Sequence, residues 1–163
     1  MKKAHLQFSL NASLVWVDVW AFEHGLRQTK GAASPSTSGY DYERLTGLYQ
    51  GPFLGKKFDA PWALPARERL RAKFLRYLTE QGRRLMQAGQ VDQAISVFEK
   101  GLDTDELAEE FYCNLMRCYQ ILGRPAEALR VYQRCQKILA AALGVSPGPE
   151  TQSLYQAVRS AAD

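Results

Sequence analysis

The first part of the chain is patterned differently from the rest. Leu6, Phe8 and Leu10 alternate with polar residues, and a run of apolar, β-branched and aromatic residues follows up to position 17. Alternation of this kind is typical of a β-strand with one buried face. Residues 1–17 are therefore predicted to form a short β-hairpin. An isolated hairpin is only marginally stable in water, so its apolar face needs a partner.

Beyond position 17, apolar residues recur at intervals of three and four, which is the spacing of one face of a helix. This pattern predicts seven helices, at about residues 19–30, 40–50, 62–88, 91–102, 106–122, 125–143 and 150–161. Asp59 and Pro61 precede the longest helix and form a typical helix start. The apolar face of that helix is predicted to consist of Leu64, Leu70, Phe74, Leu75, Tyr77, Leu78 and Leu85.

The chain also resembles itself at an offset of 34 residues, the length of a tetratricopeptide repeat (TPR). In each unit a glycine ends the first helix, helix A, because glycine accepts the left-handed turn that follows. An alanine then lets the second helix, helix B, approach closely. The matching pairs are Leu78 and Tyr112, Leu85 and Tyr119, Gly89 and Gly123, Ala94 and Ala128, Phe98 and Tyr132, and Gly101 and Cys135. Gly82 has the place of the first TPR glycine, and Met116 departs from it in the second unit. The sequence thus predicts an all-α fold, a TPR-like right-handed helical bundle with a short N-terminal β-hairpin.

A second resemblance is more specific than the repeat, because its motifs occur in order over about residues 17–158. The motifs are Leu45-Thr-Gly-Leu48-Tyr49-Gln-Gly51-Pro-Phe53-Leu54, Trp62 with Arg67 and Arg69, Asp105-Glu-Leu107-Ala-Glu109-Glu110, Gly123-Arg-Pro-Ala-Glu127-Ala128-Leu129, and Leu143-Gly144-Val145-Ser-Pro147-Gly-Pro149-Glu150-Thr151. With these motifs, the chain resembles the bacterial transcriptional activator domain, a TPR-like domain of antibiotic regulatory proteins and related bacterial transcription regulators.

The resemblance implies a place in a larger regulator, because in this family the domain follows a winged-helix DNA-binding domain. Residues 1–17 resemble the wing of a truncated winged-helix domain, and residues 18–163 resemble the activator domain. Since the recognition helix is missing, DNA contact is expected through an adjacent winged-helix domain that is not present in this chain. The implied function is regulatory: the domain would couple a signal or a protein partner to the DNA-bound regulator.

Several partners are compatible with that function, namely RNA polymerase, a sensor domain or a second protomer, and a homodimer stays open. The alternative is a free-standing TPR adaptor or scaffold without a transcriptional role.

Charge points to candidate binding residues. The formal net charge of +4 and the pI of about 9.0 permit an anionic partner but do not demand nucleic acid. The helix A positions expected to face a partner-binding groove are Arg76, Arg83, Glu110 and Arg117. A stripe for phosphate or an acidic partner is expected at Arg69, Lys73 and Arg84. The alternative is a charged face that is merely solvated.

Catalytic and metal-binding patterns are missing from the sequence. His5 and His24 are the only histidines, and neither lies beside an acidic cluster. Cys113, Cys118 and Cys135 lack the C-x2-C spacing of a zinc or redox pair. We therefore expect no enzymatic activity and no cofactor or metal. Since no run of about twenty apolar residues occurs, a cytoplasmic location without a membrane partner is expected.

Overall fold

The computed structural model describes residues 18–29, 38–51 and 61–161 of the chain. Within these ranges it contains seven α-helices, one 3-10 helix and no strand. The helical fold predicted from the periodicity is confirmed, and its arrangement is consistent with a TPR-like fold. The hairpin predicted for residues 1–17 lies outside the described ranges. The chain divides into two compact units, residues 1–52 and 53–163.

The first unit consists of helices α1 (Asp18–Thr29) and α2 (Ser38–Leu48), which pack against each other. Asp18 is the first residue of α1, and its side-chain Oδ1 accepts a hydrogen bond from the neighbouring Val19 amide at 2.8 Å. The Phe22 ring of α1 lies 5.8 Å from the Tyr49 ring that follows α2. Both predicted helices are confirmed, with the ends of α1 shifted by one residue and those of α2 by two.

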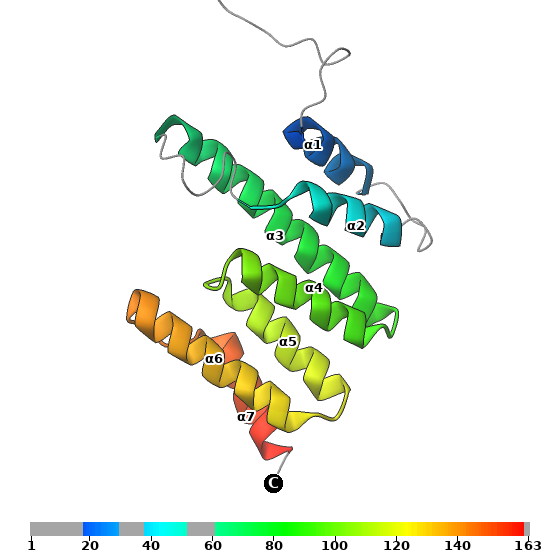
Figure 1. Cartoon of the computed structure of the whole chain (residues 1–163). Helices are drawn as coiled ribbons and strands as arrows, with labels where there is room; N and C mark the ends of the chain where they lie inside the picture. The colour runs from blue at the N-terminus through cyan, green and yellow to red at the C-terminus, as the bar shows by residue number, and fades with distance from the viewer. Residues whose placement is uncertain (1–17, 30–37, 52–60, 162–163) are drawn as a thin grey trace, which may run out of the picture. The chain divides into compact units, whose positions relative to one another are not determined.

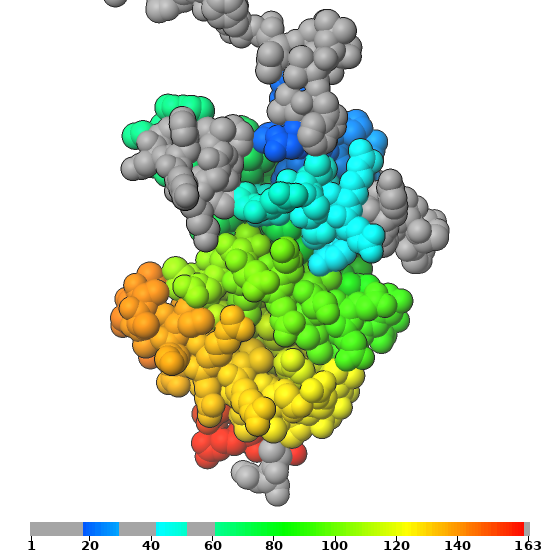
Figure 2. Space-filling model, in the orientation of Figure 1, coloured from blue at the N-terminus to red at the C-terminus, as the bar shows by residue number. Residues whose placement is uncertain are grey.

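The second unit begins with the 3-10 helix η2 (Pro61–Ala63) and continues through five α-helices. These are α3 (Leu64–Gln87), α4 (Val91–Thr104), α5 (Glu109–Ile121), α6 (Pro125–Leu143) and α7 (Pro149–Ser160). Each of the helices α3 to α6 packs against the next, and α7 packs against both α5 and α6 (Figure 1). Figure 2 shows α4, α5 and α6 forming a continuous surface on the visible face of this unit.

The start of α3 differs from the prediction. The α-helix begins at Leu64, after the 3-10 turn, with Pro65 in its first turn. Asp59, the predicted cap, lies outside the described residues. Leu64 was assigned to the apolar face, yet it is half exposed, because it lies in the first turn of the helix. The remaining residues of that face are buried or half-buried, as predicted.

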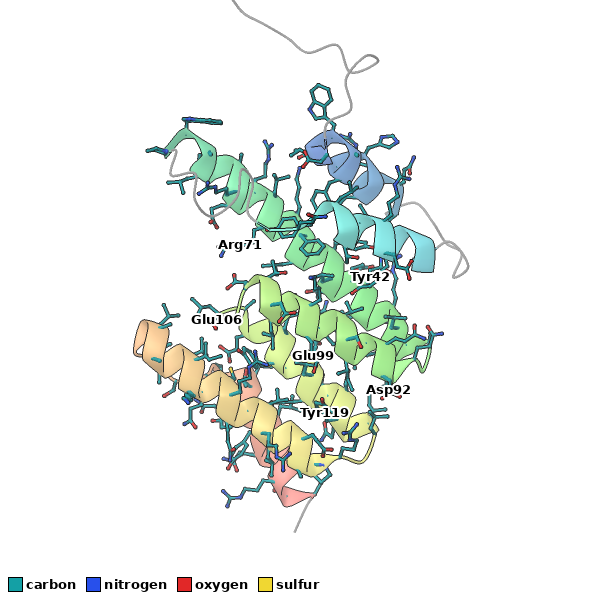
Figure 3. The ribbon with its side chains drawn as sticks, in the orientation of Figure 1. Tyr42, Arg71, Asp92, Glu99, Glu106 and Tyr119 are labelled. Atoms are coloured by element: carbon teal, nitrogen blue, oxygen red, sulfur yellow. The ribbon has the colours of Figure 1, made fainter. Side chains whose placement is uncertain are left out.

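The predicted start of α5 is also wrong by three residues. Asp105 has an extended backbone, and its Oδ1 accepts a hydrogen bond from the Leu107 amide at 3.1 Å, which forms a turn in place of a helix. The same carboxylate pairs with Arg71 of α3 at 3.4 Å. Tyr112 then donates a hydrogen bond to the Glu106 carbonyl oxygen. Figure 3 labels Arg71 and Glu106, which lie on the same side of the second unit. These side-chain contacts hold the residues after Asp105 in a turn, so the α5 helix begins only at Glu109.

The repeat pattern explains the core of the second unit. Gly89 and Gly123 have φ angles of +74° and +67°, so both A helices end in the left-handed turn that favours glycine. Ala94 and Ala128 are fully buried at the equivalent positions of α4 and α6. Gly82 is required for a different reason: a Cβ atom there would lie 2.2 Å from the Phe98 ring. In the core of the first repeat, the aromatic ring of helix B thus packs directly on a glycine of helix A.

The core of the second repeat is packed differently, because Met116 occupies the position that Gly82 has in the first repeat. Met116 is fully buried in a cluster with Ala128 and with Val158 of α7. Tyr132, the counterpart of Phe98, is only partly buried and stacks on Tyr155 of α7 with ring centroids 4.1 Å apart. The terminal helix therefore supplies part of the core of the second repeat.

Candidate functional site

Two ion pairs connect successive A-type helices of the second unit. Arg83 of α3 contacts Glu110 of α5, with Nη2 and Oε1 2.8 Å apart. Arg117 of α5 contacts Glu150 of α7, with Nη2 and Oε1 2.5 Å apart. We call the side of α3, α5 and α7 that carries these four residues the A-helix face. Thr79 of α3 adds a hydrogen bond from its hydroxyl to Glu110 at 3.4 Å.

The two ion pairs repeat the same arrangement. The arginines are 34 residues apart, and each glutamate is the second residue of its helix. Arg83 and Arg117 are among the residues expected from the sequence to face a partner-binding groove. In the structure each arginine pairs with a glutamate of the next A-type helix, Arg83 with α5 and Arg117 with α7. All four side chains are more than one third exposed, so each pair stabilises the fold by about 1 kcal/mol or less. An anionic group of a partner can therefore displace either glutamate from its arginine with a loss of about 1 kcal/mol or less.

The other predicted residues have mixed surroundings. Arg76 lies two turns before Arg83 on α3, is exposed, and forms no ion pair within the described residues. Arg84 pairs with Glu80 one turn earlier, at 3.1 Å, so this part of the predicted stripe is neutralised within its own helix. Arg69 is exposed and Lys73 is half-buried on the same helix. The binding roles of the predicted groove and stripe stay predictions.

The structure also reveals a basic helix face that the sequence analysis missed. Arg130, Arg134 and Lys137 are exposed on α6 at spacings of four and three residues, and none forms an ion pair within the described ranges. Arg134 lies over the Tyr112 ring at 6.0 Å. The helical spacing of these residues could have identified the face from the sequence.

A partly buried polar cluster connects α7 to α5. Glu109 accepts hydrogen bonds from the Gly148 amide at 2.7 Å and from the Thr151 hydroxyl. Thr151 is almost fully buried, and its Oγ1 lies 3.0 Å from the Cys113 thiol. The sequence motif contained Glu109 and Thr151 but gave no sign that they meet, because 42 residues separate them. The cluster holds the start of α7, which carries Glu150 of the A-helix face.

The three cysteines are buried and reduced. Burial raises the pKa of the Cys118 thiol to about 11 and that of the Cys135 thiol to about 12. Burial also raises the pKa of Cys113, although its hydrogen bond to Thr151 opposes this. Thiols that stay protonated near neutral pH are poor nucleophiles and poor metal ligands.

Burial likewise raises the pKa of Tyr119 on α5, and the carboxylate of Glu99 on the neighbouring α4 raises it further. Both residues are labelled in Figure 3. In the part of the chain that the structure describes, no three acidic, histidine or cysteine side chains are grouped so that they could hold a metal ion. Residues 18–29, 38–51 and 61–161 therefore offer charged side chains suited to binding, and the thiols among them are not activated as nucleophiles.

Comparison with known families decides the classification. The family model of the bacterial transcriptional activator domain matches residues 17–159, nearly the whole chain. The chain belongs to this family. The resemblance inferred from the motifs is therefore confirmed, and the bacterial transcriptional activator domain is a regulatory family, not an enzymatic one.

No curated protein matches the chain. Among the helices of this bacterial transcriptional activator domain that the structure describes, none is long and apolar enough to cross a membrane.

Proposed function

We propose that this chain is the regulatory and protein-interaction part of a bacterial transcription regulator, acting in the cytoplasm. Residues 18–163 form the activator domain, and its A-helix face contacts a protein partner: RNA polymerase, a sensor domain or a second protomer. DNA is reached through a winged-helix domain adjacent to it. The domain couples partner binding to the DNA-bound regulator and performs no chemical step itself.

The observation that carries this proposal is the repeated ion pair of the A-helix face. Arg83–Glu110 and Arg117–Glu150 present the same charged arrangement twice, on helices related by the 34-residue repeat. Repeat proteins commonly bind partners through such periodic surfaces. Because both pairs are exposed, an acidic group of a partner can exchange with either glutamate without opening the core. Arg76 adds a positive charge on the same helix as Arg83.

The proposal is tested by titrating the full chain with purified RNA polymerase subunits and, separately, with promoter DNA, each at two salt concentrations. The test variant changes Arg76, Arg83 and Arg117 to alanine. A polymerase subunit that binds the native chain, and binds this variant at least ten-fold more weakly, supports the proposal. Each lost contact should weaken the salt dependence of binding.

The matched control changes Arg130, Arg134 and Lys137 of α6 to alanine, which removes the same charge from another face. Equal weakening by both variants would show a non-specific charge effect and contradict the proposal. Binding to DNA alone, with sequence-independent and salt-sensitive affinity, would also contradict it, because the arginines would then act as phosphate contacts.

A further inference from the structure

The outer side of α4 carries a row of acidic side chains. Asp92, Glu99 and Asp103 are exposed and lie seven and four residues apart, so they fall within an arc of about 40° around the helix. This arc faces away from the buried Ala94 and Phe98. Within the described residues, none of the three carboxylates forms an ion pair. We call these three residues the acidic row, and Figure 3 labels two of them.

The outer side of α6 carries the opposite charge. Its exposed bases are Arg130, Arg134 and Lys137, which we call the basic row. They lie within about 60° of one another around the helix. Lys137 follows Asp103 by 34 residues, so one outward position of the repeat is acidic in α4 and basic in α6. The two repeats therefore match in their buried positions and differ in charge on their outer side.

Each row has a single sign of charge. Lys100 is the only base of α4, and it is turned by about 100° from its neighbour Glu99, away from the acidic row. Glu127 is the only acid of α6, and it pairs with Arg124 at 2.7 Å. Neither residue therefore neutralises the row on its own helix.

The arrangement of the two helices makes this surface complementary to itself. Both α4 and α6 are B helices, both pack against α5, and Figure 1 shows that they run in the same direction. We call their outer sides together the B-helix face. A two-fold axis parallel to the helices places α4 of one copy opposite α6 of another, and α6 opposite α4. The acidic and basic rows extend over about 16 Å and about 10 Å, so the basic row fits within the length of the acidic one.

The presence of both charges on one face favours one kind of partner. A nucleic acid bound to the basic row would also be repelled by the carboxylates of the acidic row on the same face. A uniformly acidic protein surface would meet the same repulsion. A second copy of the chain presents acids to the basic row and bases to the acidic row at the same time.

We propose that the B-helix face is a contact between two copies of this chain, in which α4 of each copy pairs with α6 of the other. This inference goes beyond the proposed function, because it concerns a different face from the A-helix face and requires no other protein. The contact consists of exposed charged side chains, so it is weak and depends on salt.

The contact is measured by sedimentation equilibrium of the full chain at about 50 mM and about 500 mM sodium chloride, with protein up to about 1 mM. We expect an average mass above that of one chain at low salt, and association at least ten-fold weaker at high salt. Each copy has a formal net charge of +4, so association that does not use the two rows should strengthen with salt. A monomer under all conditions, or association that strengthens with salt, would overturn the proposal.

Charge reversal tests whether the two rows meet each other. One variant changes the basic row to glutamate, and another changes the acidic row to lysine. Each should associate at least ten-fold more weakly than the native chain, because like charges then face each other. A third variant carries both sets of changes, keeps the formal net charge of +4, and should associate as the native chain does. If the third variant is folded, as judged by circular dichroism, and stays monomeric, the rows do not pair and the proposal is wrong.

The matched control is the variant with Arg76, Arg83 and Arg117 changed to alanine, which alters the A-helix face alone. Its self-association should stay within about two-fold of the native value. Loss of self-association in this control would place the contact on the A-helix face and overturn the proposal. Because no other protein is present in these measurements, self-association can fail while polymerase binding through the A-helix face holds, and the reverse.

Discussion

The two repeats of the second unit share one register but close their cores in different ways. In α3 and α4, Phe98 packs on Gly82 and is fully buried. In α5 and α6, Met116 occupies the glycine position, and Tyr132 is only partly buried against Tyr155 of α7. One residue on helix A thus decides where the aromatic ring of helix B goes. Both rings also meet the next A-type helix: Phe98 lies 6.3 Å from the Phe111 ring of α5, and Tyr132 lies 4.1 Å from the Tyr155 ring of α7. Only the first ring packs on a glycine of its own repeat as well.

The largest test of this comparison truncates the two equivalent rings. Phe98→Ala should lower the free energy of unfolding by about 3–5 kcal/mol, because it leaves a cavity in a closed core. Tyr132→Ala should cost clearly less, since its ring is partly exposed. Urea denaturation of both variants measures the difference. Equal losses would mean that the second repeat is closed as tightly as the first.

A smaller effect is expected from adding one methyl group to the first repeat. Gly82→Ala places a Cβ atom against the Phe98 ring and should destabilise the fold by about 1–3 kcal/mol, despite the higher helix propensity of alanine. Gly47 lies in α2 with open space around it, so Gly47→Ala is the matched control and should stabilise by up to about 1 kcal/mol. Thermal denaturation compares them. Stabilisation by both changes would disprove the tight ring contact.

The repeats also differ in their response to alkaline pH, because all three thiols lie in the second. The pKa of Cys118 is raised to about 11 in the folded chain, and an exposed thiol ionises near pH 8.5. Stability is therefore complete below about pH 8.5 and falls as the pH rises, since only the unfolded chain loses the proton.

The expected slope is about 1.4 kcal/mol per pH unit for each such thiol. Urea denaturation at pH 8, 9 and 10 measures it, and Cys118→Ala should make the decline shallower. An unchanged slope in that variant would mean that Cys118 ionises in the folded chain.

The smallest expected effect is the difference in free energy of unfolding between substitutions in the two ion pairs. Arg83→Gln should cost about 1 kcal/mol or less and lose its effect at high salt. Arg117→Gln should cost more, because it also weakens the hydrogen bond to the buried Asn114. Stability measured at low and high sodium chloride gives both values. If both substitutions lower the free energy of unfolding equally at both salt concentrations, the hydrogen bond between Arg117 and Asn114 does not contribute to stability.

Much of the fold could be predicted because large and small side chains recur at equivalent positions of the 34-residue repeat. Gly89 and Gly123 mark both turns, and the buried Ala94 and Ala128 mark the close approach of each helix B. Helix starts were harder: the start of α5 depends on Asp105, whose contacts with Leu107 and Arg71 are not local propensities.

The candidate site was only half predictable for the same reason. The spacing identified Arg83 and Arg117, but their partners lie 27 and 33 residues away on other helices. The burial of Asn114 beside Arg117 appears only when α5 and its neighbours are folded together, because burial is a property of the assembled core.

The hydrogen bond from Gly148 to Glu109 gives one loop amide an unusual property. Amide protons in connecting segments ordinarily exchange with solvent quickly, but this one is held at 2.7 Å by a side chain of another helix. Its exchange rate therefore reports how often α7 leaves α5. The exchange of this one amide proton thus measures the local opening of the helix that completes the second repeat.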